Sequence, residues 1–210
     1  MTPGEYADSK RIRILFYRAG LKDSFGIDDL ISMWSGLWPG NWGTGPYSHC
    51  ELMFYDRNFD NEFAKLAHNY RMSNLTCLGY PLRGICYSSA TRGKFTGVRF
   101  ALIDEVLKNK SRWDYIDIDL SEALEQILWD ECRKLEGAKY DFLGIFGKTT
   151  FFTDFIQSYN RWYCSEVVDY VLTQIGVFNK HNRLSPRAFS RKVVKDWGKL
   201  SNLETGKYAK

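Results

Sequence analysis

The segment RWYCSEVVDYVLTQIG, residues 161–176, carries most of the information about the fold. Its apolar residues recur at helical spacing: Val168, Val171, Leu172 and Ile175. Gly176 follows them as a residue that commonly ends a helix. The segment therefore predicts a helix with Cys164 at its first turn. Unpaired backbone N–H groups and the helix dipole favour an anion there, so a thiol at this end becomes more acidic and more nucleophilic.

Upstream of this helix, several short runs have the alternation expected of strands. In residues 11–19, Ile12, Ile14 and Phe16 share one face, and Leu15 lies with the arginines on the other. Similar runs predict further strands at residues 48–55, 84–89, 95–102 and 113–120. A short helix is expected at 24–34, followed by an irregular Gly- and Trp-rich loop at 35–46.

Two more helices are expected after the strands. Ser121 has the pattern of an N-cap for a helix that ends at Gly137. Its apolar positions at helical spacing are Leu124, Ile127, Leu128, Cys132 and Leu135. Ser185-Pro186 matches the N-cap and first position of another helix. Strands followed by helices indicate an α+β fold, with a mainly antiparallel sheet packed against the Cys-bearing helix.

Length and charge limit the class of protein. A chain of 210 residues can form one sizeable core, so we expect a single domain over 11–200 between tails at 1–10 and 201–210. The net charge of +4 comes without a long basic run, which argues against nucleic-acid binding. No apolar stretch approaches the ~20 residues of a membrane span, and no signal peptide is recognisable. These features predict a cytoplasmic protein.

The cysteines are expected to be reduced thiols: Cys50, Cys77, Cys86, Cys132 and Cys164. Their number is odd, no CxxC occurs, and a zinc site would lack ligand spacing. Metal and cofactor are therefore not expected.

Cys164 needs a base if it is a nucleophile. His49 is the strongest candidate, because it begins a strand directly after the Gly- and Trp-rich loop and can be aimed across a sheet at a helix start. Such a pair would perform acyl transfer through a thioester. In the alternative, Cys164 is a buried core thiol and His49 a surface histidine. His68 and His181 show no partner pattern and are expected at the surface.

Several motifs, in this order, resemble the circularly permuted NlpC-type papain-like cysteine hydrolases, bacteriophage-encoded members in particular. They are YSHCELMF (47–54), GICYSS (84–89), AKYDFLGIF (138–146), WYCSEVVDYVL (162–172) and LSPRAF (184–189). The resemblance covers about residues 12–190. In that family the His-bearing strand precedes the Cys-bearing helix, so the resemblance implies a permuted papain-like fold.

By this resemblance Cys164 is the nucleophile and His49 the general base. The family's third residue, which orients the imidazole, usually comes from the next strand and is often an acid, but here the matching position is Ser88. Glu51 is an alternative, because it lies two residues after His49 on the same strand face and an adjacent acid favours a Cys⁻/His⁺ pair. Equally, Glu51 could pair with a basic residue such as Arg99.

Other positions have more ordinary interpretations. Glu166 suits the first turn of a helix for structural reasons, and Tyr140-Asp141 would position the helix before the site. Aromatic residues near the loop could line a substrate groove or simply pack: Trp38, Trp42 and Tyr47.

The resemblance implies a hydrolase that cleaves an amide or ester bond, with a peptide or acyl substrate and cell-wall peptide as the first expectation. No cofactor is required. One alternative is a virion-associated structural or accessory protein that keeps the scaffold, which predicts an occluded Cys164 and a large exposed apolar patch. Another is a cytosolic effector that acts on a host protein or on acyl groups.

Overall fold

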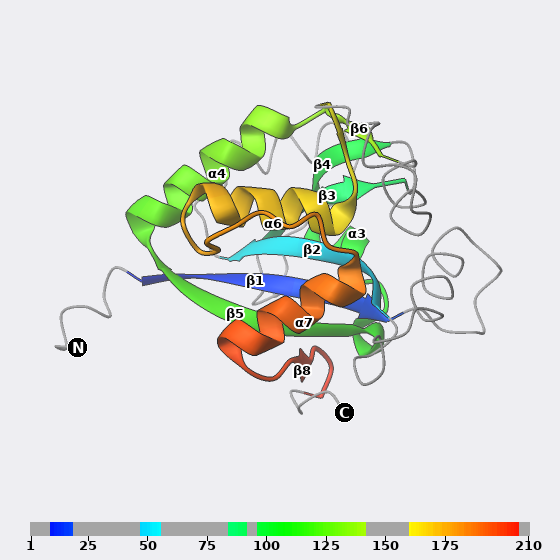
Figure 1. Ribbon diagram of the computed structural model, residues 1–210. Helices are drawn as coiled ribbons and strands as arrows, with labels where there is room; N and C mark the ends of the chain where they lie inside the picture. Colours follow the sequence, from blue (N-terminus) through cyan, green and yellow to red (C-terminus); the bar gives the residue numbers. More distant parts are fainter. Residues whose placement is uncertain (1–8, 19–46, 56–83, 92–95, 142–159, 206–210) are drawn as a thin grey trace, which may run out of the picture.

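An antiparallel sheet organises the protein in a computed structural model that describes residues 9–18, 47–55, 84–91, 96–141 and 160–205 (Figure 1). Its six strands lie in the order β4-β3-β2-β1-β5-β8, and each neighbouring pair is antiparallel. The strands are β1 (Ser9–Arg18), β2 (Tyr47–Tyr55), β3 (Gly84–Ala90), β4 (Gly97–Leu102), β5 (Trp113–Ser121) and β8 (Ser201–Asn202). A short parallel pair joins β6 (Lys139–Tyr140) to β7 (Arg161–Trp162).

Three helices form a layer on one face of the sheet (Figure 1). They are α4 (Glu122–Leu135), α6 (Cys164–Gln174) and α7 (Pro186–Trp197). α6 packs against β2 and β3, α7 against β2, and α4 against β1 and β5. The one-turn helix α3 (Ile103–Val106) follows β4, and a 3-10 turn (Lys110–Arg112) precedes β5. The described part is therefore α+β with a mostly antiparallel sheet, as the sequence predicts; the sixth strand of the main sheet, β8, was not predicted.

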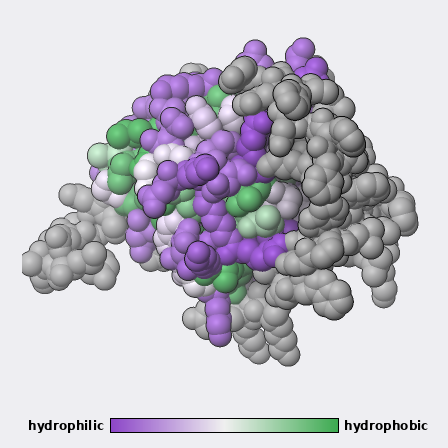
Figure 2. Space-filling model, viewed as in Figure 1, coloured by the Kyte–Doolittle hydropathy of each residue, from purple (hydrophilic) through white to green (hydrophobic). Residues whose placement is uncertain are grey.

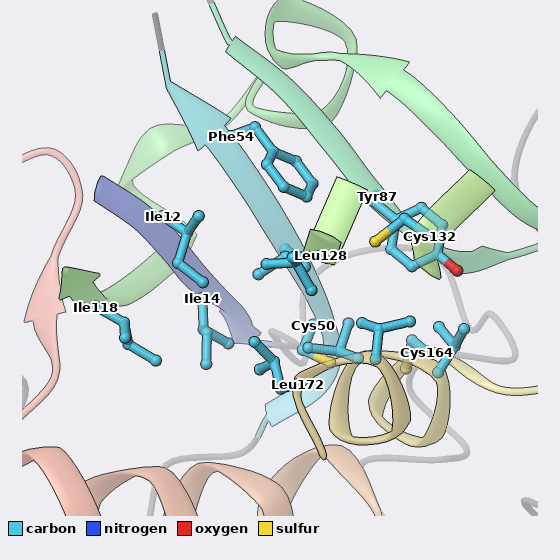
Figure 3. Close-up of a cluster of buried hydrophobic side chains, with 14 of the residues drawn as sticks. Ile12, Ile14, Cys50, Phe54, Tyr87, Ile118, Leu128, Cys132, Cys164 and Leu172 are labelled. Atoms are coloured by element: carbon cyan, nitrogen blue, oxygen red, sulfur yellow. The ribbon is translucent and has the colours of Figure 1, made fainter. Parts of the chain in front are cut away.

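The two faces of the sheet have separate apolar clusters. Ile12, Ile14 and Phe16 of β1 lie in a large cluster together with side chains of α4, α6 and α7, which we name the helix-side core. Leu15 lies in a smaller cluster that includes Ile103, on the opposite face. The alternation read from β1 is confirmed. Figure 3 shows part of the helix-side core, with Cys50 of β2 and Cys164 of α6 at its edge.

Helix α4 begins as the sequence predicts but turns a different face inward. The Ser121 hydroxyl accepts a hydrogen bond from the Leu124 N–H at 3.3 Å, so Ser121 is the N-cap. The buried positions are Glu125, Leu128, Trp129 and Cys132. Leu124 and Ile127, predicted on the apolar stripe, are 37% and 48% exposed. Figure 2 shows several hydrophobic areas among hydrophilic residues on this face, one of them near the start of α4.

Regular structure extends slightly beyond the expected domain. β1 begins at Ser9 and β8 occupies Ser201–Asn202, so the sheet extends two residues into each expected tail. The helix expected at 24–34 and the loop at 35–46 lie outside the described residues. In the part of the chain that is described, no helix combines the length and apolar character needed to cross a membrane.

Candidate active site

Cys164 is the first residue of α6, with Tyr163 in the N-cap position. The helix start is held by the segment after α6: the Tyr163 hydroxyl donates to the Arg183 carbonyl at 2.5 Å, and the Ser165 hydroxyl donates to the Leu184 carbonyl at 2.6 Å. Cys164 is only 1% exposed. The sulfur is therefore fixed at the positive end of the helix dipole, as the sequence predicts.

A β-bulge precedes His49 on the neighbouring strand. Tyr17 pairs with His49 and Arg18 pairs with Tyr47, so Ser48 is an extra residue in β2. A bulge increases the local twist and re-aims the side chains beside it. His49 lies with its ring edge toward Trp113, centroid to centroid 6.3 Å, and its side chain is 15% exposed.

The sulfur of Cys164 is surrounded by hydrogen-bond donors from β2. The groups that lower its pKa are the Cys50 thiol, the His49 side chain and the Cys50 backbone. Burial alone would raise the pKa of Cys164. The hydrogen bond from the Cys50 thiol, the charge and hydrogen bond of His49 and the Cys50 backbone together lower the pKa well below its ordinary value. The geometry therefore favours a thiolate.

Cys86 in the same sheet shows how burial affects the pKa of a thiol that has no such donors among the causes of its shift. The pKa of Cys86 is raised well above the ordinary value, first by burial and then by the charge of Glu51. Cys50 is also shifted upward, by burial and by its contact with the Cys164 thiolate, so it stays a protonated donor. The surroundings of Cys164 therefore lower the pKa of its thiol, whereas those of Cys86 and Cys50 raise theirs.

Glu51 is the partner of the imidazole. Its Oε1 atom lies 2.8 Å from His49 Nε2, which leaves Nδ1 as the ring nitrogen available to the Cys164 sulfur. The same carboxylate accepts from Arg99 Nη2 at 2.8 Å and from Nη1 at 3.3 Å. The two alternatives for Glu51 are therefore both present. One carboxylate can accept from both partners because its oxygens together offer about four lone-pair sites.

The charges of these groups reinforce one another. Burial would raise the pKa of Glu51, which is 1% exposed, but Arg99 and His49 lower it to about 2. Burial would lower the pKa of His49, but the charge and hydrogen bond of Cys164, together with Glu51, raise it to about 10. These pKa shifts favour a chain of alternating charges at neutral pH: Cys164⁻, His49⁺, Glu51⁻ and Arg99⁺.

Ser88 lies in the neighbourhood but contacts the backbone. Its hydroxyl donates to the Cys50 carbonyl at 2.7 Å, with a second, longer contact to the Ser89 carbonyl at 3.5 Å. Its cross-strand partner on β4 is Arg99. Ser88 therefore supports the strand that presents Cys50, and the ring nitrogen Nε2 of His49 is engaged by Glu51 instead.

Glu166 and His181 belong to a second polar network, formed between α6, the segment after it and α7. Glu166 Oε1 lies 2.7 Å from Arg183 Nε, and burial raises the Glu166 pKa despite that arginine. Asp169 is fully buried, accepts from the Asn182 N–H at 2.7 Å and pairs with Lys192 and with His181, whose Nδ1 lies 3.0 Å away. The expectation that His181 lacks a partner is wrong, because the fold brings the segment after α6 back onto the helix.

Other positions singled out from the sequence make contacts that hold strands together. Tyr47 is buried, and its hydroxyl donates to Asp114 at 2.6 Å, so it connects β2 to β5. The Asp141 N–H donates to the Trp162 carbonyl at 3.1 Å, extending the β6–β7 pair. Trp38, Trp42 and His68 lie outside the described residues.

Sequence reasoning missed Cys50. Strict alternation puts Cys50 on the face opposite His49, which separates it from the base. That face is, however, the one covered by α6, so the thiol of Cys50 meets the sulfur of Cys164. A signal in the sequence was the alternation of β2, which puts Cys50 on the same face as the apolar residues Leu52 and Phe54 that a helix must cover.

Metal binding has no evident site in the described part: no cluster of three or more His, Cys, Asp or Glu side chains there is arranged to hold an ion. Comparison with known proteins assigns no family. No protein-family model matches the sequence, and no curated protein is significantly similar to it.

Proposed function

We propose that the protein is a cysteine hydrolase with a permuted papain-like fold, in which Cys164 is the nucleophile and His49 the general acid and base. The observation that carries this proposal is the position of Cys164 at the start of α6 beside His49, whose Nε2 lies 2.8 Å from Glu51 Oε1 and whose charge lowers the Cys164 pKa. Thiol hydrolases require a nucleophile beside a base, and the base is in turn oriented by a third group, here a carboxylate.

In the first step the Cys164 thiolate attacks the carbonyl carbon of an amide or ester. The S–C bond forms as the carbonyl electrons move to oxygen. N–H groups at the start of α6 are suited to hold that oxyanion, because the first turn of a helix leaves donors without intrahelical acceptors. As the tetrahedral intermediate collapses, the bond to the leaving group breaks, and His49 donates a proton to the departing amine or alcohol.

Formation of the thioester changes the acidity of His49. The pKa of about 10 in the resting site depends on the negative charge and the hydrogen bond of Cys164. An acylated sulfur supplies neither, while burial continues to favour the neutral imidazole. His49 can then take a proton from water, and the hydroxide adds to the thioester. Release of the carboxylic acid regenerates the thiolate and the protonated imidazole.

Glu51 and Arg99 act as positioning residues for this reaction. Glu51 orients the ring and stabilises the imidazolium, and Arg99 keeps Glu51 ionised. Neither side chain is required to contact the substrate.

The bond and substrate follow from the resemblance and not from the site geometry. We propose cell-wall peptide as the first substrate class, with acyl groups and conjugated proteins as alternatives. The test is release of new amine or carboxylate ends from peptidoglycan fragments, compared with ester and acyl substrates. Cys164→Ala should abolish turnover and Cys132→Ala, in the helix-side core, should retain it. Equal activity of the two variants would refute the proposal.

A second candidate is a virion structural or accessory protein that retains the scaffold. It is favoured by one observation, the 1% exposure of Cys164. Its other expectation is a large apolar patch; the exposed large apolar side chains of the described part are Leu124 and Ile127, both on α4. Thiol labelling at neutral pH distinguishes the candidates: a hydrolase should be labelled fastest at Cys164, whereas an occluded scaffold should leave it no faster than the other cysteines.

A further inference from the structure

Two thiols meet in the site, and the hydrolase mechanism uses only one as a nucleophile. Cys50 of β2 and Cys164 of α6 are both free, and both are buried in the helix-side core where α6 packs against β2. Figure 3 shows the two side chains next to one another where β2 meets the start of α6. A disulfide requires sulfurs about 2 Å apart, so the two side chains must move toward each other before the bond can form.

The two sulfurs differ in the way that a reactive and a resolving thiol must differ. Cys164 is held as a thiolate by its donors, and the thiolate is the form that attacks an oxidant. Burial and the neighbouring Cys164 raise the pKa of Cys50, so this thiol stays protonated and reacts slowly with an oxidant. It therefore remains available to attack the oxidised Cys164 sulfur. Cys86 lies on the opposite face of the sheet in the smaller cluster.

We propose that Cys164 and Cys50 form a reversible disulfide when the protein meets a peroxide. The Cys164 thiolate attacks one oxygen of hydrogen peroxide, an S–O bond forms and the O–O bond breaks. The sulfur loses two electrons and becomes a sulfenic acid, and the departing hydroxide takes a proton and leaves as water. The Cys50 sulfur then attacks the Cys164 sulfur, the S–S bond forms, and the hydroxyl leaves as a second water with the Cys50 proton.

A dithiol reductant reverses the change by two thiol exchanges and restores both thiols. The disulfide protects Cys164 from irreversible oxidation to sulfinic and sulfonic acids. If the proposed hydrolase activity is correct, the disulfide also switches that activity off. The chemistry of the two thiols stands on their contact and does not depend on any substrate.

The experiment is peptide mapping without reductant after a short exposure of the folded chain to hydrogen peroxide. We expect a Cys50–Cys164 cross-linked peptide lighter by two hydrogen atoms than its parts. The thiols titratable after denaturation should fall from five to three and return with dithiothreitol. Cys86→Ser should form the same cross-link. Cys50→Ser should instead accumulate a sulfenic acid on Cys164, trapped by dimedone, and then a sulfinic acid.

The readout is a mass, so it separates this proposal from the hydrolase proposal. A protein that forms the cross-link but cleaves no substrate supports the redox proposal and contradicts the hydrolase proposal. A wild-type chain in which Cys164 proceeds to sulfinic acid beside an unmodified Cys50 overturns the redox pair, whatever its activity. Absence of oxidation at Cys164, or cross-links spread at random over the cysteines, overturns it equally. The wild-type measurement decides the question even if a variant fails to fold.

Discussion

Replacement of Glu51 by glutamine tests the charge chain through stability. The substitution keeps the shape of the side chain and removes its charge between Arg99 and His49. The folded protein lowers the pKa of Glu51 from 4.5 to about 2, and at about 1.4 kcal/mol per pH unit this corresponds to about 3 kcal/mol of stability at pH 7. Because the folded pKa is depressed, this contribution is present above the unfolded pKa and is lost as the pH falls toward the folded pKa.

We therefore expect Glu51→Gln to lower the free energy of unfolding by about 3 kcal/mol at pH 7, or somewhat more because Arg99 is left beside a cation. At pH 3 the loss should be smaller by about 2 kcal/mol, because part of the wild-type contribution has gone. The assay is urea unfolding followed by tryptophan fluorescence at both pH values. The same change at the exposed Glu204 is the matched control and should have little effect.

Equal destabilisation of Glu51→Gln at pH 7 and pH 3 would refute the reasoning, because a charge-dependent loss must fade as the wild-type carboxylate loses its advantage. A loss below about 1 kcal/mol at pH 7 would also refute it, since that value is typical of an exposed pair and not of a buried one.

Three further substitutions test the scaffold by urea unfolding at pH 7. Gly97→Ala should cost at least about 2 kcal/mol, because Gly97 has a φ of 127° and an added Cβ would lie 2.2 Å from the Ala138 carbonyl oxygen; wild-type stability would contradict this. Ser121→Ala should cost about 1 kcal/mol through loss of the α4 N-cap, and no change would show that the cap is dispensable. Asp169→Asn should cost about 3 kcal/mol because it leaves Lys192 without its buried counter-ion, and a neutral result would argue against that pair.

The sequence was sufficient to locate strands β1 to β5 and the starts of α4, α6 and α7. Period-two alternation in β1 assigned Ile12, Ile14 and Phe16 to one face, and that is the face the helices cover. Cap residues such as Ser121 and Ser185 act locally, so their role was visible without tertiary information. Strand and helix patterns of this kind depend on neighbours in the chain.

What the sequence could not supply was set by contacts between distant segments. Leu124 and Ile127 fit a helical stripe, but α4 is rotated so that Glu125 and Trp129 face inward. The choice between His49 and Arg99 as partners of Glu51 could not be made from spacing, because the carboxylate takes both. The rotation of α4 depends on its packing against β1, β5 and α6, and the partners of Glu51 depend on how β3 and β4 lie beside β2. No local sequence pattern specifies either packing.

The central claim is that Cys164 and His49 form a thiolate–imidazolium pair, and the most direct test is the pH dependence of Cys164 alkylation. Iodoacetamide labelling is quantified for each cysteine by mass spectrometry, in the wild-type chain and in His49→Ala. The account predicts a Cys164 rate that is nearly constant through the neutral range and falls markedly at pH 7 in the variant. A wild-type rate that rises about tenfold per pH unit up to pH 8, as for an ordinary thiol, and that is unchanged by His49→Ala would contradict it.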